Sequence, residues 1–207
     1  LALVSEYIPN GSLFSYIQKY EPNLNYNLIW IDTGTKHQSL LNKELSQRYH
    51  FDRKLFFSTI SKSKVNEGIT TTYLSAINLC EKSNYFLPLE EDWKLISNPK
   101  IGFISKSLQI LDKSPDSLIG LVYKNTIARQ QPEKLFTLKI NDFEEYTIRY
   151  SYHRKFSYTN GASIYKMATL KKLIDITNFH NNLCFELSLS KHVTHQKKFF
   201  GLVDFIN

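Results

Sequence analysis

The stretch Val65–Trp93 reads VNEGITTTYLSAINLCEKSNYFLPLEEDW, and it predicts a helix followed by a buried strand. Apolar residues recur near helical spacing between positions 70 and 80, and positions 85–89 form a short apolar run. That run ends in three consecutive carboxylates, Glu90–Asp92. A helix that leads into a buried strand is the repeating unit of an α/β sheet, whose ligands bind at the carboxyl ends of the strands.

The same alternation precedes this stretch. Apolar runs at 1–7, 27–31 and 54–60 predict strands, and helices are expected after the turn at 9–12 and around 40–45. Strands that alternate with helices favour a parallel arrangement, because the helices serve as crossovers. We therefore expect an α/β fold with a central, mainly parallel sheet flanked by helices.

The second half of the chain has a different pattern. Its predicted strands are rich in β-branched and aromatic residues and suit antiparallel additions to the sheet. We expect these strands at 118–123, 135–140 and 146–152, helices at 166–176 and 181–191, and a final apolar run at 199–206. A soft seam near 96–101, where Asn98-Pro99 interrupts the pattern, is the nearest approach to a boundary. Residues 1–207 are therefore predicted to form one domain.

Composition excludes several classes of protein. The net charge is +7 and the isoelectric point about 9.2, but the basic residues are scattered, which argues against a nucleic-acid surface and suits attraction to a phosphate. No apolar stretch is long enough to span a bilayer, and the first residues lack the basic leader of a signal peptide.

Location and thiol state follow less directly from the sequence. A cytoplasmic location is the expectation, although the absence of an initiating Met indicates residues upstream that would carry any leader or anchor. Cys80 and Cys184 read as two buried free thiols, and a disulfide between them stays open.

The carboxylates of Glu90–Asp92 carry the clearest chemistry. Three acidic groups at the end of a buried strand concentrate negative charge, and a hard divalent cation compensates such charge. Oxygen ligands suit Mn²⁺ or Mg²⁺, which share the phosphate oxygens of a bound nucleotide. The alternative is a solvated acidic turn, and the position after a buried strand favours the metal.

Three pieces in this order resemble the GT-A glycosyltransferases, particularly their family 2 type. The pieces are Ile29-Trp30-Ile31-Asp32-Thr33-Gly34-Thr35, then Asn66-Glu67-Gly68, then the strand that ends in Glu90-Glu91-Asp92. In that family a strand ends in an Asp-Thr-Gly-Thr-like motif, and Asn-x-Gly, a helix and an Asp-x-Asp motif follow. The resemblance covers the first ninety-odd residues.

The resemblance implies roles for individual residues. Asp32 would contact the nucleobase or ribose, Asp92 would bind the metal, and Glu90 would stand where the family has the first Asp of the motif. The longer side chain of Glu90 puts its direct contact with the metal or ribose in question. The further donor-binding residues implied are Tyr7 near the base, Lys64 as a phosphate contact or a solvated lysine, Asn66, Gly68 and Glu91.

A fainter resemblance extends into the second half. Asn160-Gly161-Ala162-Ser163 looks like the small-residue loop beside the sugar and acceptor, where glycine permits close approach of the backbone. Glu186 matches the acidic residue that serves inverting members as general base, or it is a helix-surface glutamate, since Leu187 replaces the second acid of the usual pair. Were Glu186 excluded, Asp116, Asp142 or Glu144 would be the next candidates.

Two late histidines add a further metal hypothesis. His192 and His195 lie three residues apart on one predicted helix, and either is a candidate ligand to the metal. The alternative is a polar helix end in which histidine is favoured by the helix dipole.

The function implied is metal-dependent transfer of a hexosyl or deoxyhexosyl group, with inversion, to the hydroxyl of a glycan or glycoconjugate. The donor is expected to be a UDP-sugar, with GDP- and dTDP-sugars as alternatives. Residues 1–95 would bind this donor, and residues 96–207 the acceptor. Two other readings are a sugar nucleotidyltransferase, disfavoured because no glycine-rich basic loop follows the first strand, and a non-catalytic nucleotide-sugar binding module.

Overall fold

The computed structural model describes residues 2–5, 13–32, 38–48, 52–56, 65–89, 101–123, 134–142, 144–150, 163–179, 185–196 and 199–202. In chain order the elements are β1 (Ala2–Ser5), α1 (Leu13–Tyr20), β2 (Asn27–Asp32), α2 (Gln38–Arg48), β3 (Arg53–Phe56), α3 (Val65–Leu79), β4 (Tyr85–Leu89), α4 (Phe103–Lys113), β5 (Leu118–Val122), β6 (Lys134–Asn141), β7 (Glu144–Tyr150), β8 (Ser163–Lys166), α5 (Met167–Asp175), α6 (Phe185–His195) and β9 (Phe199–Leu202).

The described strands form one sheet in the order β3-β2-β1-β4-β8-β5-β9-β7-β6. The first four neighbours, β3, β2, β1 and β4, are parallel, as are β5 and β9. β8 runs antiparallel to both β4 and β5, and β7 runs antiparallel to both β9 and β6. The prediction of a mainly parallel sheet is therefore right for β1–β4 and wrong for the whole sheet, which is mixed.

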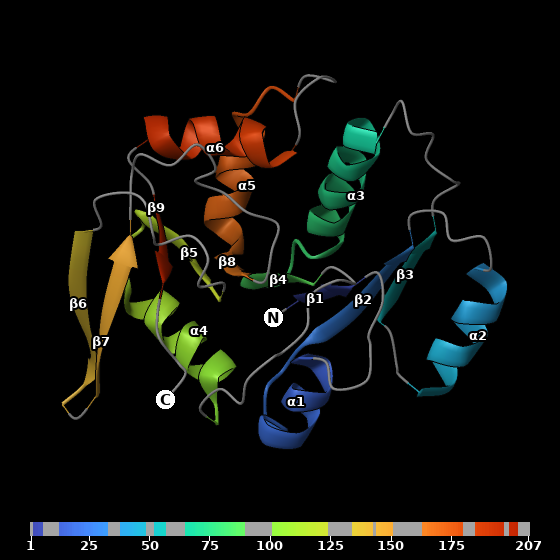
Figure 1. The fold of residues 1–207 in the computed structure, drawn as a ribbon, viewed down its shortest axis with the longest axis horizontal. Helices are drawn as coiled ribbons and strands as arrows, with labels where there is room; N and C mark the ends of the chain where they lie inside the picture. The colour runs from blue at the N-terminus through green and yellow to red at the C-terminus, as the bar shows by residue number, and fades with distance from the viewer. Residues whose placement is uncertain are drawn as a thin grey trace.

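Helices cover both faces of the sheet (Figure 1). The alternation along β2 shows why, since Leu28 and Trp30 belong to the core beneath α1 and α4, while Ile29 and Ile31 belong to the core beneath α3, α5 and α6. All four side chains are at most 2% exposed. Burial of a large apolar side chain contributes about 1.5–3 kcal/mol, so β2 stabilises both layers at once.

Helix α4 is the main element that the sequence analysis did not predict. Its buried residues recur at helical spacing and face the core: Phe103, Ile104, Ser107, Ile110 and Leu111. It follows Gly102, whose φ of 78° is in the left-handed region that glycine adopts readily. The seam expected at 96–101 is thus followed at once by a packed helix.

Charged side chains bind both ends of α4. The Glu21 carboxylate accepts hydrogen bonds from the backbone N–H groups of Ile104 (3.0 Å) and Ser105 (2.8 Å) at the first turn. At the other end, the Lys166 ammonium donates to the carbonyl of Ser114 (3.0 Å). An anion at the amino end and a cation at the carboxyl end both oppose the helix dipole, so each stabilises α4.

The helix predicted at 166–176 is confirmed as α5 (Met167–Asp175), and a short strand that was not predicted precedes it. This strand is β8 (Ser163–Lys166), which pairs through Tyr165 with Phe86 of β4 and Gly120 of β5. Pairing with two flanking strands fixes its extended backbone. The next helix, predicted at 181–191, is observed as α6 at Phe185–His195.

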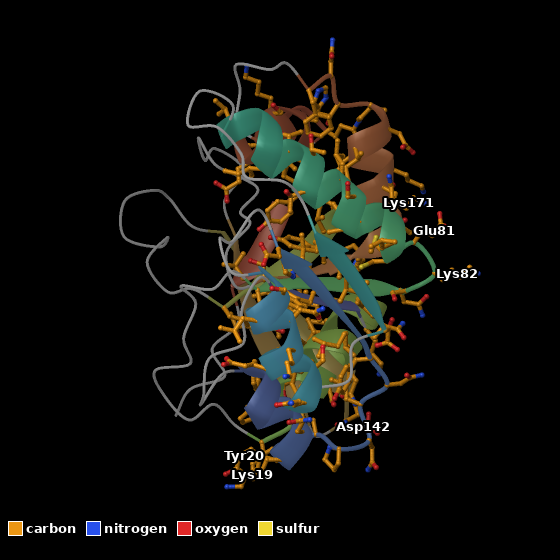
Figure 2. The ribbon with its side chains drawn as sticks, turned by 90° about the vertical axis from the view of Figure 1, so that its right-hand side faces the viewer. Lys19, Tyr20, Glu81, Lys82, Asp142 and Lys171 are labelled. Carbon is orange, nitrogen blue, oxygen red and sulfur yellow. The ribbon has the colours of Figure 1, made fainter. Side chains whose placement is uncertain are left out.

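Among the described residues, one exposed ion pair joins two elements at the surface. Lys171 of α5 lies 3.5 Å from Glu81 in the connection between α3 and β4, and Figure 2 shows this pair far from Lys19 and Tyr20 at the end of α1. Both partners of the ion pair are well exposed, and such pairs contribute about 0–1 kcal/mol. The apolar layers therefore dominate the stability of the fold.

Cys80 is a buried free thiol, as predicted, whereas Cys184 lies outside the described residues. Burial raises the pKa of the Cys80 thiol to about 12, so it is protonated and unreactive at neutral pH. Among the described helices, none has the length and apolar character needed to cross a membrane.

Candidate functional site at the carboxyl edge of the sheet

The carboxyl ends of β1, β2 and β4 lie side by side at one edge of the sheet. The register pairs Ser5, the last residue of β1, with Trp30 on one side and with Leu89 on the other. Leu89 is the last residue of β4, and β2 continues for two residues to Asp32. In parallel α/β sheets this is the edge where ligands bind, and we call it the carboxyl edge.

Asp32 is the predicted donor-binding residue that the structure places at this edge. It ends β2, pairs in the ladder with Phe56 of β3 and is only 2% exposed. A buried carboxylate is costly unless hydrogen bonds or a cation compensate its charge. Asp32 is therefore a buried acidic group at a strand end and not part of a solvated turn.

The first residue of β8 also lies at the carboxyl edge. β8 is antiparallel to its neighbours, and its first residue, Ser163, pairs with Val122, the last residue of β5. Ser163 is fully buried, and its Oγ has no hydrogen-bond partner among the described residues. An unsatisfied buried hydroxyl costs about 1–3 kcal/mol, so this Oγ needs a partner from a ligand, a water or another part of the chain.

Glu186 occupies the first turn of α6 and is half-buried. Its neighbour Phe185 is fully buried and stacks on Tyr73 of α3 and on Phe179, with ring centroids 5.2 Å apart in both pairs. Stacked aromatic rings fix the start of α6 against α3, so the backbone of Glu186 is held by packing. No contact with the Asn160–Ser163 segment is described, and the general-base role stays a prediction.

The role of His192 or His195 as a metal ligand stays a prediction, because its proposed partners Glu90 and Asp92 lie outside the described residues. His192 lies six residues after Glu186, which on an α-helix is a rotation of about 240°, so the two residues face different directions. The side chain of His195 lies outside the described residues. Among the described residues, no group of three His, Cys, Asp or Glu side chains is placed to hold a metal ion.

The Asn-x-Gly piece lies inside helix α3 and not before it. We expected Asn66-Glu67-Gly68 to precede the helix, but α3 already begins at Val65. Gly68 therefore lies inside the helix, where its carbonyl accepts a hydrogen bond from the Thr72 hydroxyl at 2.8 Å. The side chain of Asn66 lies outside the described residues, so the amide groups of the first turn are what this piece offers to a phosphate.

Most of the remaining predicted site residues fall outside the described residues. They come from the segments that follow β1, β3 and β4 and the segment that precedes β8: Tyr7, Lys64, Glu90, Glu91, Asp92, Asn160, Gly161 and Ala162. Their roles stay predictions. The described strands from which they continue all meet the carboxyl edge.

A buried polar cluster near the carboxyl end of β5 was not predicted. Tyr123 follows β5, and burial above all raises the pKa of its hydroxyl above the ordinary value. The pKa of Tyr16 is also raised, first by burial and then by the neighbouring Glu21 carboxylate. The regular apolar spacing of α4 was the available sequence signal, whereas nothing in the sequence paired Glu21 with a helix 83 residues away.

Comparison with known proteins supports the class of fold. No family model matches the sequence, and the search of curated proteins also finds no match. The structure is similar to the crystal structure of S. aureus TarS 1–349, with a TM-score of 0.55, 14% identity and coverage of 97% of this chain and 57% of that chain. The same protein in complex with UDP gives a TM-score of 0.52, 13% identity and coverage of 97% and 56%.

These neighbours are glycosyltransferases, and the likeness shows that this chain has a glycosyltransferase-like fold. At this level of identity the comparison speaks to fold alone. The chain spans somewhat more than half the length of the TarS structures that it matches.

Proposed function

We propose that this chain transfers a sugar from a nucleoside diphosphate sugar to an acceptor hydroxyl. The observation that carries the proposal is the carboxyl edge, where the ends of β1, β2, β4 and β5 and the start of β8 meet in a glycosyltransferase-like fold. One of the similar structures holds UDP, which favours a UDP-sugar as donor over GDP- and dTDP-sugars. The acceptor proposed is a hydroxyl of a glycan or glycoconjugate.

The chemical step proposed is a direct displacement with inversion. The acceptor oxygen attacks the anomeric carbon, the bond from that carbon to the diphosphate oxygen breaks, and the acceptor proton passes to the carboxylate of Glu186. Positioned proton transfer of this kind contributes about 10²–10⁴-fold in rate. Glu186 is half-buried at the start of a packed helix, which supports its role as general base. Such a base must be held in place and must still be accessible to the acceptor.

A divalent cation, Mn²⁺ or Mg²⁺, would be held by Asp92 with Glu90, and it would neutralise charge on the diphosphate leaving group. The register supports this placement, since β4 ends at Leu89 on one side of β1 and β2, which ends at the buried Asp32, lies on the other side of β1. The described residues alone offer no such ligand set, so the proposal depends on the three carboxylates that follow β4.

Nucleotide binding and turnover test the proposal separately. Thermal stabilisation by UDP, GDP and dTDP, each with and without Mn²⁺, should single out UDP with Mn²⁺. Release of UDP from a panel of UDP-sugars, with and without added glycan acceptors, should then show metal-dependent transfer or slow hydrolysis. Binding without any release of UDP would identify a non-catalytic binding module, and absence of binding to all three nucleotides would refute the proposal.

A further inference from the structure

Three aromatic rings meet at the first turn of α6. Phe185, the first residue of α6, is fully buried and contacts one ring from each of two other segments. Tyr73 of α3 stacks on it with an interplanar angle of 23°, and Phe179, which follows α5, stacks on it at 6°. We call these three residues the aromatic stack. It fixes the start of α6 to α3 and to the segment that follows α5.

Glu186 lies on the inward face of α6. Residues at i+3, i+4 and i+7 share the face of a helix with residue i. For Glu186 these residues are all buried, at most 2% exposed: Leu189, Ser190 and Val193. A glutamate on the outer surface of α6 would share its face with exposed residues instead. Because Glu186 is half-buried, part of its side chain stays accessible at the first turn of this inward face.

The aromatic stack lies toward the carboxyl edge. α5 begins where the parallel strands begin, since Met167 N–H donates to the Asn84 carbonyl (2.9 Å), and Phe179 follows the other end of α5. α6 ends at His195, close in sequence to β9, which starts beside the start of β5. Phe185 is at the opposite end of α6. Both helices therefore have their ends nearer the carboxyl edge at the aromatic stack.

We propose that the aromatic stack holds Glu186 for proton transfer, with Tyr73 as a positioning residue. Phe185 and Glu186 are consecutive, so a shift of the Phe185 ring also moves the backbone of Glu186. A displacement of about 1 Å of a catalytic group can lower the rate about 10²-fold. This inference rests on the proposed function and assigns Tyr73 no contact with the donor or the acceptor.

Tyr73→Leu is the informative variant, because it keeps an apolar side chain and removes the ring. Tyr73→Phe keeps the ring and should retain the parental kcat. Tyr16→Leu is the matched control: Tyr16 of α1 also contacts two rings, those of Tyr20 (5.0 Å) and Phe103 (5.1 Å), but it belongs to the core on the other face of the sheet. It has no proposed part in transfer.

The measurement uses the UDP-sugar and glycan acceptor on which the parent chain turns over fastest, in saturating Mn²⁺. We expect both leucine variants to lower the melting temperature and only Tyr73→Leu to lower kcat, by about 10- to 100-fold. Calorimetric titration with UDP should give the parental affinity in both variants.

A double variant tests whether Tyr73 acts through Glu186. Residues that act through one group are not additive, so Tyr73→Leu should cause no further loss of kcat once Glu186→Gln is present. A merely structural role of Tyr73 would lower kcat by the same factor in both backgrounds.

Equal kcat in Tyr73→Leu and Tyr16→Leu, or a further loss of kcat in the double variant, would overturn the inference and leave the proposed function standing. Weakened UDP binding in Tyr73→Leu would also overturn it. A parent chain that releases no UDP from any UDP-sugar would refute both. If Tyr73→Leu does not fold, Phe179→Leu removes the other ring that contacts Phe185, and the inference then requires the same loss of kcat from that variant.

Discussion

The two edges of the sheet differ in what gathers there. At the carboxyl edge, the ends of the parallel strands and the start of β8 bring together a buried carboxylate, Asp32, and a buried hydroxyl, Ser163. The opposite edge, where the parallel strands begin, is called the amino edge. Polar groups there are paired within the fold, as when Met167 N–H donates to the Asn84 carbonyl (2.9 Å) and the Tyr85 hydroxyl donates to Asp112.

This difference separates function from stability within one sheet. Groups that satisfy one another inside the fold contribute to its stability, whereas a buried hydroxyl such as that of Ser163 is costly until a ligand or another partner meets it. Mutations at the carboxyl edge should therefore lower activity with little loss of stability. Mutations at the amino edge should do the reverse.

The largest effect expected is from Asp92→Asn. Loss of one carboxylate from the proposed metal site should abolish metal-dependent transfer while the melting temperature hardly changes, because no core packing is removed. Addition of EDTA to the parent chain should have the same effect on activity. Asp112→Asn, at the amino edge, is the control and should keep its turnover. Unchanged turnover of Asp92→Asn in saturating Mn²⁺ would remove Asp92 from the mechanism.

Glu186→Gln comes next. The amide keeps the shape of the side chain but cannot accept the acceptor's proton, so kcat should fall about 10²–10⁴-fold with the UDP affinity unchanged. Glu81→Gln removes an exposed glutamate and should leave kcat as in the parent. A Glu186→Gln variant with parental kcat would exclude Glu186 as the general base and leave Asp116, Asp142 and Glu144 as candidates.

Gly120→Ala tests the sheet between the two edges. A Cβ at Gly120 would lie 2.3 Å from the carbonyl oxygen of Ile164 and 2.8 Å from the Tyr165 ring, so β5 and β8 must move apart. Overpacking of this kind costs about 1–3 kcal/mol in the free energy of unfolding. Gly102→Ala meets no atom within 4 Å and suffers only from its positive φ, at about 1–2 kcal/mol. Chemical denaturation should rank the two variants in that order.

Tyr85→Phe should have the smallest effect and touch stability alone. Loss of the hydrogen bond to Asp112 should cost about 1 kcal/mol, since Asp112 is exposed and water replaces its partner. Burial, with the hydrogen bond to Asp112, raises the pKa of Tyr85 above its ordinary value of 10.0.

The dependence of stability on pH above about pH 10 is a second measurement for Tyr85→Phe. The folded chain holds the Tyr85 proton more tightly than the unfolded chain does. The contribution of Tyr85 to the free energy of unfolding is therefore fully present below about pH 10 and is lost as the pH rises above 10. Tyr85→Phe should therefore lose less stability than the parent between pH 10 and pH 11. A parallel pH dependence of the two chains would contradict the role of Tyr85.

The strands of the first half were predictable because each is a short apolar run between turn signals. β8 was not, because Ser163–Lys166 is only four residues long and continues into α5 without a turn. Its strand conformation comes from pairing with β4 and β5, which are 74 or more and 41 or more residues away in sequence. α4 was predictable in principle, since its buried positions follow helical spacing.

The candidate site was predictable to the level of strand ends. Asp32 ends a buried strand, and parallel pairing with β1 brings the ends of β2 and β4 to the same edge, one on each side of β1. The hydrogen bonds of Glu21 were not predictable, because a glutamate after a helix gives no sign of the distant N–H groups that it will meet. Side-chain partners of this kind depend on how layers pack rather than on local pattern.

The position of β9 has a consequence for how the chain folds during synthesis. β9, the last described strand in the sequence, lies between β5 and β7, and within the sheet the β6–β7 hairpin is joined to the other strands through it. The hairpin, at 134–150, is translated some fifty residues before the strand that receives it. While a nascent chain is still being extended, the hairpin can form from its own local pairing, but its place in the sheet is completed only after residue 202 has left the ribosome.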